Sequence, residues 1–174
     1  MKHTADAVRS PLRWVQPRLS DRRFELRNCE GLVATLSFRN ASGTFASARS
    51  ADGRWTFKRV GLWQTRATVR AEGATADLAG FDYHTWGCGG TIRLADGRAI
   101  RVTANLRQQP VEFQFTEGHP LFRYRTDGFP LRQSDVDVLP PLECMPEMPW
   151  LLLFGWYLVV MMYQDSTTYV AMVG

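Results

Sequence analysis

The residues best suited to chemistry are basic side chains on two short, strand-like segments in the first half of the chain. Arg54 and Lys58 lie four residues apart on one segment, and Arg66 and Arg70 lie four residues apart on the next. Alternate residues of a strand share a face, so these four side chains are expected to form an outward stripe. Arginine binds phosphate bidentately and lysine binds it as a point charge, which makes the stripe a candidate anion site. The competing interpretation is an ordinary solvated face, where polar residues are expected anyway.

The loop from Phe81 to Gly90 holds a second set of reactive side chains. His84 and Cys88 are of types that bind zinc or act as base and nucleophile, and Asp82 is a candidate to orient the histidine. Two ligands do not complete a zinc site, and the glycines of this loop also fit a tight turn or bulge. We therefore expect no metal and no catalytic residue here, and we predict that the chain is not an enzyme.

Acidic residues precede the most apolar part of the sequence. Asp135, Asp137, Glu143 and Glu147 lie in the stretch that leads to it. They are explained by solvation and by the positive end of a helix dipole. They do not form a calcium loop, because the glycine and the distal glutamate that such a loop requires are missing. No phosphate loop, serine elbow or dinucleotide fingerprint occurs, so no cofactor is expected.

The segment from Trp150 to Tyr163 decides the architecture. Its fourteen residues include no charge and no amide, so a helix formed by them must be covered on every side. At 1.5 Å per residue it spans about 21 Å, against about 30 Å for a bilayer core. Pro149 suits a first helical turn, and Gly155 indicates close packing. We predict a buried helix over about 149–164. The alternative is a tail anchor in the membrane, with Trp150, Trp156 and Tyr157 as an aromatic belt at the membrane interface.

The chain between residues 12 and 139 has the period of β-structure. Short runs of Val, Phe, Trp and Thr alternate with turn signals such as Asp52-Gly53 and Asp96-Gly97. Strands are predicted near 12–16, 22–28, 31–38, 44–49, 54–60, 65–71, 76–81, 90–95, 98–105, 111–116, 121–126 and 135–139. Apolar and charged residues alternate within them, which predicts antiparallel sheet with one dry face. A barrel of about twelve strands needs a plug, and the apolar helix fits.

Composition is typical of one mildly basic domain. The 174 residues carry a net charge of +4, and Lys2 and Lys58 are the only lysines. Residues 1–11 are interpreted as a polar leader and 12–174 as a single domain; no secretory signal is recognised. Three cysteines at distant spacings indicate a reducing compartment. We expect a cytoplasmic protein, peripheral at the membrane, that is monomeric and does not bind nucleic acid.

This layout resembles the tubby C-terminal-like superfamily, which includes the phospholipid scramblases and the LURP-one-related proteins. The local matches are Arg54-Trp55-Thr56-Phe57-Lys58-Arg59, the hairpin Thr91–Arg98 and the helix Trp150–Tyr163. The resemblance covers about residues 12–164 and implies a binding module whose basic residues hold phosphoinositide headgroups. Of the basic residues in this sequence, only Lys58 and Arg59 lie in a local sequence that resembles the corresponding strand of the superfamily. The cysteine cluster and the calcium loop of the scramblases are missing, which argues against calcium-dependent lipid scrambling.

The resulting expectation is a non-enzymatic binding or scaffolding module. Its expected ligands are anionic membrane lipids, bound by Arg54, Lys58, Arg59, Arg66 and Arg70, and protein partners are a further class. The alternatives are a tail-anchored protein with a cytoplasmic β domain, and a small enzyme or metal site at His84 and Cys88.

Overall fold

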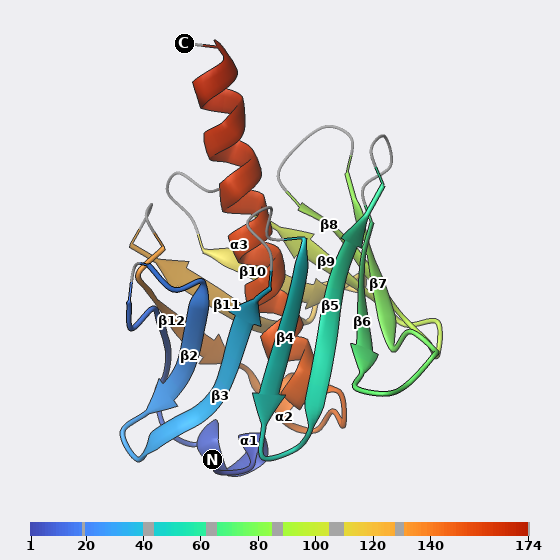
Figure 1. Cartoon of the computed structure of the whole chain (residues 1–174). Coiled ribbons are helices and arrows are strands. Elements are labelled where there is room, and N and C mark those ends of the chain that lie inside the picture. Colours follow the sequence, from blue (N-terminus) through green and yellow to red (C-terminus); the bar gives the residue numbers. More distant parts are fainter. Residues whose placement is uncertain are drawn as a thin grey trace.

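Twelve antiparallel strands close into a single barrel (Figure 1). The structure is a computed structural model that describes residues 1–18, 20–39, 44–61, 66–84, 89–104, 110–127 and 131–173, and of residues 167–173 only the backbone. The strands are β1 (Leu12–Val15), β2 (Arg23–Asn28), β3 (Gly31–Phe38), β4 (Phe45–Ser50), β5 (Arg54–Val60), β6 (Arg66–Ala71), β7 (Ala79–Tyr83), β8 (Gly89–Leu94), β9 (Ala99–Thr103), β10 (Val111–Phe115), β11 (Pro120–Thr126) and β12 (Gln133–Val138). Each predicted strand is present, with ends shifted by at most three residues.

The strands follow one another around the barrel in chain order, and β1 pairs with β12 to close it. Closure leaves no unpaired edge that would invite association with another strand. Inward positions such as Ile92, Ile100 and Phe113 are fully buried, and outward positions such as Arg93 and Arg101 are exposed. The predicted alternation of buried and exposed side chains along the strands is therefore confirmed, and the buried side chains face the inside of the barrel.

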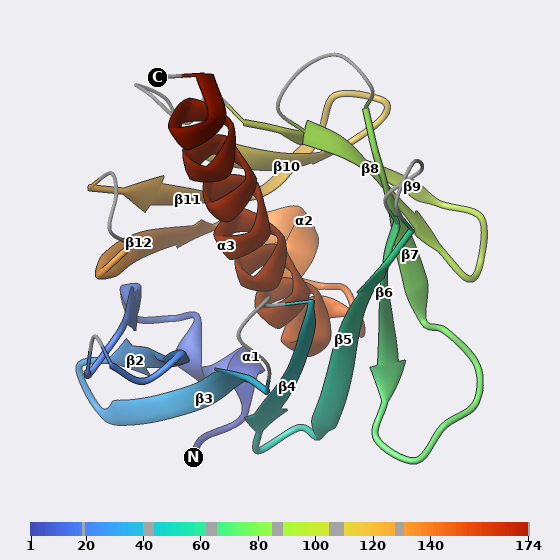
Figure 2. The same cartoon turned by 45° about the horizontal axis from the view of Figure 1, so that its top comes forward.

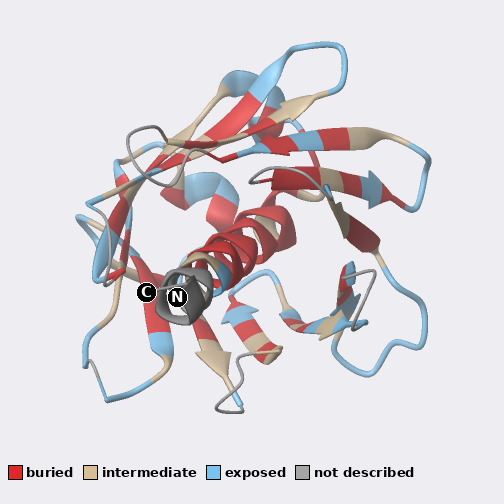
Figure 3. Cartoon of the chain, turned by 90° about the horizontal axis from the view of Figure 1, so that it is seen from above, coloured by how far each residue is buried: buried red, intermediate tan, exposed pale blue. Residues whose placement is uncertain are grey.

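Helix α3 (Met148–Val173) runs through the ring of strands (Figures 2 and 3). Every residue from Trp150 to Tyr163 is buried, and the most exposed of them, Trp150, has only 7% of its surface accessible. The predicted plug is confirmed. Gly155 allows it to pack closely, because a Cβ there would lie 2.9 Å from Phe122 Cε2 and from the Tyr124 hydroxyl.

The helix ends later than the sequence indicates. The predicted helix ends near residue 164, but α3 has 26 residues and continues to Val173, past the rim of the barrel (Figure 1). Extending an existing helix by one residue costs far less than starting one, and no glycine or proline follows Asp165 until residue 174. Within the helix, the Ser166 hydroxyl donates a hydrogen bond to the Tyr163 carbonyl at 2.8 Å.

Two short helices lie near the lower end of the barrel, α1 (Thr4–Ala7) and α2 (Pro140–Glu143) (Figure 1). The leader that contains α1 packs against the barrel, since Thr4 and Ala7 are buried. Asp52, in the turn between β4 and β5, accepts hydrogen bonds from the Thr4 backbone at 2.9 Å and from the Thr4 hydroxyl at 2.5 Å. His3 lies 2.8 Å from the same carboxylate. The N-terminal residues thus have a fixed place in the fold.

Candidate functional site

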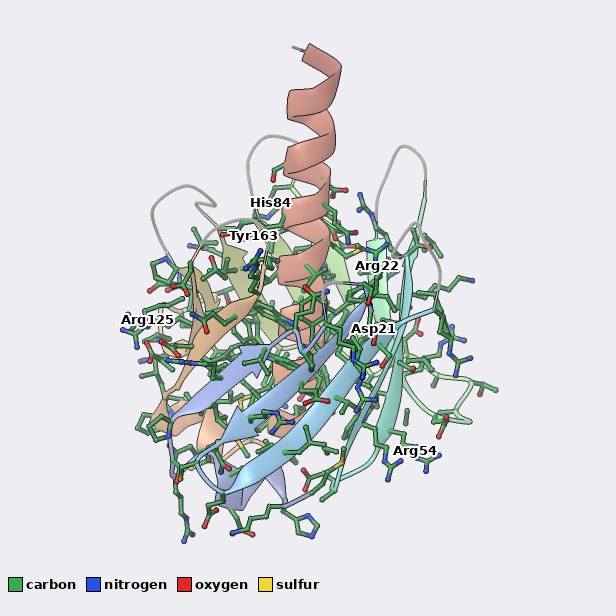
Figure 4. The ribbon with its side chains drawn as sticks, turned by 60° about the vertical axis from the view of Figure 1, so that its left-hand side comes forward. Asp21, Arg22, Arg54, His84, Arg125 and Tyr163 are labelled. Atoms are coloured by element: carbon green, nitrogen blue, oxygen red, sulfur yellow. The ribbon has the colours of Figure 1, made fainter. Side chains whose placement is uncertain are left out.

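The four residues of the predicted stripe lie on the outer face of β5 and β6. In the register of these strands, Thr56 pairs with Arg70, Lys58 with Thr68 and Val60 with Arg66. Arg54, Lys58, Arg66 and Arg70 are all exposed, and Figure 4 shows Arg54 projecting away from the barrel. The structure therefore brings the stripe together on one surface.

Three of the four stripe residues already have acidic neighbours. Arg54 lies 3.4 Å from Glu72, Arg66 lies 3.7 Å from Asp82, and Arg70 pairs with Asp77. Exposed ion pairs of this kind contribute only about 0–1 kcal/mol, so an anionic ligand can compete with them. Lys58 has no carboxylate partner in the part of the chain that the structure describes.

Arg59 does not belong to this stripe. It follows the inward parity of Trp55 and Phe57, and its guanidinium lies 2.7 Å from Asp165 of α3 and 5.1 Å from the centre of the Tyr83 ring. Partial burial acts to lower the pKa of Arg59, but the hydrogen bond to Asp165 together with the electrostatic interactions with Tyr83, Asp165 and Tyr157 outweighs it, and the pKa is raised. Arg59 is thus a charged residue that fixes α3 where it leaves the barrel.

Sequence reasoning missed part of the basic surface. Arg49 on β4, Arg93 on β8 and Arg101 on β9 are also exposed on the outer face. Arg49 stands directly across from Arg54, and Arg93 and Arg101 follow across β7 and β8. The alternation of residues along each strand indicates from the sequence that Arg93 and Arg101 face outward. The sequence does not indicate that they lie near the stripe, because that depends on which strands are neighbours in the barrel.

The two halves of the outer wall differ in charge. Outward positions of strands β4–β9 hold seven cations, Arg49, Arg54, Lys58, Arg66, Arg70, Arg93 and Arg101, and one carboxylate, Asp82. Outward positions of strands β10–β12 and β1–β3 hold five cations, Arg13, Arg23, Arg27, Arg123 and Arg125, and four carboxylates, Glu25, Glu112, Asp135 and Asp137. We call the first surface the basic half and the second the balanced half. The excess is +6 on the first (7 − 1) and +1 on the second (5 − 4).

The loop with the predicted histidine and cysteine is only partly described. His84 is exposed at the end of the barrel where α3 leaves (Figure 4), and its Nε2 lies 3.3 Å from the Thr91 hydroxyl. Asp82 is directed to Arg93 at 3.2 Å and does not orient this histidine. Cys88 lies outside the described residues. Within the described ranges, no three His, Cys, Asp or Glu side chains come together as a metal site.

The acidic residues that precede α3 separate into individual ion pairs. Asp135 lies 2.7 Å from Arg13, Asp137 lies 2.7 Å from Arg125, and Glu147 pairs with Arg98. The Glu147 carbonyl accepts a hydrogen bond from the Leu151 amide at 2.9 Å, at the start of the helix. Asp135 and Asp137 therefore connect neighbouring strands, and of these three acids only Glu147 lies at the start of α3, where a negative charge suits the positive end of the helix dipole.

No family model, curated protein or solved structure matches this chain. Of the helices described here, none combines the length and the apolar character needed to cross a bilayer. The chain is a closed barrel of twelve antiparallel strands with a C-terminal helix inside it.

Proposed function

We propose that this chain is a non-enzymatic binding module for anionic phospholipid headgroups and that it belongs to the tubby C-terminal-like superfamily. The single observation that carries the proposal is the charge of the basic half, with seven outward cations against one carboxylate. The barrel and its enclosed helix support the superfamily assignment. A module of this kind acts peripherally at a cytoplasmic membrane surface, as a monomer.

The physical basis is long-range attraction to a negative surface. Each Lys or Arg held close to an anionic bilayer contributes about 1 kcal/mol to binding. Arg49, Lys58 and Arg101 have no carboxylate partner among the residues described, so together they are worth about 3 kcal/mol, or on the order of 100-fold in affinity. The arginines that already face Glu72, Asp77 or Asp82 contribute less, because a ligand must first displace the carboxylate.

A pair of triple variants with equal charge tests the proposal. Replacing Arg49, Lys58 and Arg101 with Gln removes three positive charges from the basic half, and replacing Arg13, Arg23 and Arg125 with Gln removes three from the balanced half. Binding to phosphatidylcholine vesicles with and without phosphatidylserine is measured by sedimentation at several salt concentrations. We expect salt-sensitive binding that needs phosphatidylserine, lost on the order of 100-fold in the first variant and far less in the second. Equal losses in both variants, or equal binding to neutral vesicles, would contradict the proposal.

The alternative of a tail-anchored protein has less support. The segment that would have to enter the bilayer, Trp150–Tyr163, is enclosed by strands of its own chain. Withdrawing it would expose eleven large apolar side chains, each worth about 1.5–3 kcal/mol when buried. Membrane attachment through the outer basic surface needs no such rearrangement.

A further inference from the structure

The leader, residues 1–11, docks at the lower end of the barrel, opposite to the end where α3 leaves (Figure 1). Thr4 and Ala7 lie three residues apart on one side of α1 and are 2% and 0% exposed, whereas Ala5 and Asp6 between them are exposed. Helix α1 also contacts α3. The leader thus turns a face made of Thr4 and Ala7 toward the rest of the fold.

Asp52 supplies the hydrogen-bond acceptor that α1 lacks. His3 is the N-cap residue of α1 and makes no side-chain capping hydrogen bond. Asp52, 48 residues from Thr4 in the sequence, accepts from the Thr4 amide at 2.9 Å and from the Thr4 hydroxyl at 2.5 Å. A helix of four residues is too short to be stable by itself. Its conformation is therefore imposed by the residues on which it docks.

The turn between β2 and β3 provides two further contacts. Lys2 lies 2.7 Å from Glu30, and the side-chain amide of Asn28 donates to the Ala7 carbonyl at 3.4 Å. The fold thus recognises a cation at position 2, a hydroxyl at position 4 and a small side chain at position 7.

The groups that hold the leader are positioned without it. The Ser50 hydroxyl donates to the Asp52 carboxylate at 3.2 Å and accepts from the Asp52 amide at 3.0 Å. The Asn28 carbonyl oxygen accepts from the Glu30 amide at 3.0 Å and from the Gly31 amide at 3.1 Å. These four hydrogen bonds involve no residue of the leader, so the site keeps its shape when the leader detaches. A preformed site loses little free energy to ordering when it binds.

The leader is lightly attached compared with the strands. Its fully buried side chains, Thr4 and Ala7, are small. The Lys2 and His3 side chains, which contact Glu30 and Asp52, are 54% and 67% exposed. Segments with few buried apolar contacts and solvent-exposed hydrogen bonds open at a much lower free energy than the whole domain. The leader is thus expected to detach while the barrel stays folded.

Charge favours a basic segment at this end. The turns 29–30, 51–53, 72–78, 95–98 and 116–119 and residues 139–147 all belong to the described part of the chain. They hold one cation, Arg98, and eight carboxylates, Glu30, Asp52, Glu72, Asp77, Asp96, Glu117, Glu143 and Glu147. Without Glu72 and Asp77, which pair with arginines of the basic half, the excess is −5 (1 − 6). This end therefore attracts a basic segment and repels a second copy of itself.

We infer that the lower end of the barrel is a docking site for a basic helical turn of a partner protein, and that the leader occupies this site when the partner is absent. The matching segment has the pattern Lys-x-Thr-x-x-Ala. Asp52 accepts from the amide and hydroxyl of its threonine, Glu30 pairs with its lysine, and Asn28 donates to the carbonyl of its alanine. The inference goes beyond the proposed function and does not rest on it, because the site lies away from the outer basic surface.

A peptide with the sequence of residues 1–11, blocked at both ends and labelled with fluorescein, serves as the probe. Its binding to the full chain is followed by fluorescence anisotropy. In the protein, Ala7→Asp places a charge at a fully buried position and detaches the leader, and Thr4→Val weakens the leader while keeping its volume. Both leave Asp52, Asn28 and Glu30 in place. Circular dichroism establishes that each variant is folded, and Thr4→Val carries the test if Ala7→Asp is not.

The wild type is expected to bind the peptide weakly, because its tethered leader competes at an effective concentration of about millimolar. Ala7→Asp should bind it about tenfold more tightly or better, and Thr4→Val by a smaller factor. Adding Asp52→Asn to Ala7→Asp should weaken binding by about tenfold, the lower end for a hydrogen bond to a charged group. The matched control is Asp96→Asn, which removes a carboxylate at the same end that does not contact the leader. In the peptide, Thr4→Val should also cost about tenfold and Ala5→Ser nothing.

Three results would overturn the inference. The first is Ala7→Asp and Thr4→Val binding the peptide no better than the wild type, and the second is Asp96→Asn weakening binding as much as Asp52→Asn. The third is a wild-type dimer in analytical ultracentrifugation that Ala7→Asp converts to a monomer, which would make the occupant the leader of a second copy. Binding to phosphatidylserine vesicles is measured on the same variants. Its retention would show that the proposed function stands when the docking site fails.

Discussion

The two halves of the barrel differ inside as well as outside. The balanced half directs seven aromatic side chains inward, Trp14, Phe24, Phe38, Phe113, Phe115, Phe122 and Tyr124, whereas the basic half directs four, Trp55, Phe57, Phe81 and Tyr83. The remaining inward positions of the basic half are mostly small or aliphatic, among them Ala46, Ala48, Ala67, Val69, Ala79 and Ile92. The balanced half therefore directs more aromatic rings into the barrel than the basic half does.

Aromatic side chains from both halves contact α3. Trp156 of α3 stacks on Trp14 with ring centres 5.5 Å apart and meets Phe24 and Tyr124 edge-on. The Tyr124 hydroxyl also donates to the Leu152 carbonyl at 2.5 Å. From the basic half, Phe57 contacts Phe154 at 5.5 Å between ring centres. Phe57 also contacts Tyr157 at 5.4 Å, so both halves hold the helix, the balanced half through Trp156 and the basic half through Phe154 and Tyr157.

The largest expected effect compares one tryptophan from each half. Trp14→Ala removes a fully buried ring stacked on Trp156, and Trp55→Ala removes a ring that lies beside Gly53 and is 7% exposed. Loss of a buried tryptophan costs about 3–5 kcal/mol, and an aromatic pair adds about 1 kcal/mol. We expect Trp14→Ala at the upper end and Trp55→Ala at the lower end. Urea unfolding followed by circular dichroism measures both; equal losses would break the comparison.

The inside of the barrel could be predicted because it obeys local rules. Alternation along each strand showed which side chains face inward, and a segment as apolar as Trp150–Tyr163 has to be enclosed. The same parity places Arg59 inward with Phe57, a signal that we overlooked because the resemblance grouped Arg59 with Lys58. The strands and the helix core were accordingly found from the sequence.

The outer surface was less predictable, because its pairs join residues far apart in the sequence. Glu72 and Asp77, which face Arg54 and Arg70, lie in the turn after β6, where nothing local marks them as partners. The shared contact of Asp82 with Arg66 and Arg93 needs three neighbouring strands in register. The end of α3 differs for another reason, because helix propagation carries the helix beyond its apolar segment into polar residues such as Ser166.

An intermediate effect concerns the link between the halves at Asp52. The α1 helix leads into β1 but is held by this acid of the β4–β5 turn. Partial burial acts to raise the pKa of Asp52, but hydrogen bonds from Thr4, His3 and Ser50 outweigh it and the pKa is lowered. A lowered pKa in the folded state adds stability above the ordinary pKa of about 3.9, and this stability is lost as pH falls through the folded value.

Asp52→Asn tests this link. At neutral pH the variant should be less stable by about 1 kcal/mol, the net worth of a hydrogen-bonded charge of this kind. As pH falls below about 4 toward the lowered pKa of folded Asp52, the gap to the wild type should narrow, because the wild-type carboxylate progressively loses its charge. Urea midpoints between acid and neutral pH measure the gap. A gap that is constant with pH would show that Asp52 does not hold the N-terminal segment through its charge.

The smallest expected change in stability comes from reversing one charge on the outer surface of each half. Arg49 faces Arg54 across β4 and β5, whereas Arg123 faces Glu112 on β10 and Asp137 on β12. Like charges directly opposite are destabilising and opposite charges stabilising, by about 0.2–1 kcal/mol. Arg49→Glu should therefore raise the urea midpoint at low salt and Arg123→Glu should lower it, with both shifts fading at high salt. Shifts of the same sign would contradict the division into halves. Opposite shifts would mean that the cation excess lowers the stability of the basic half, so that an anion bound there stabilises the folded protein by relieving repulsion as well as by direct contact.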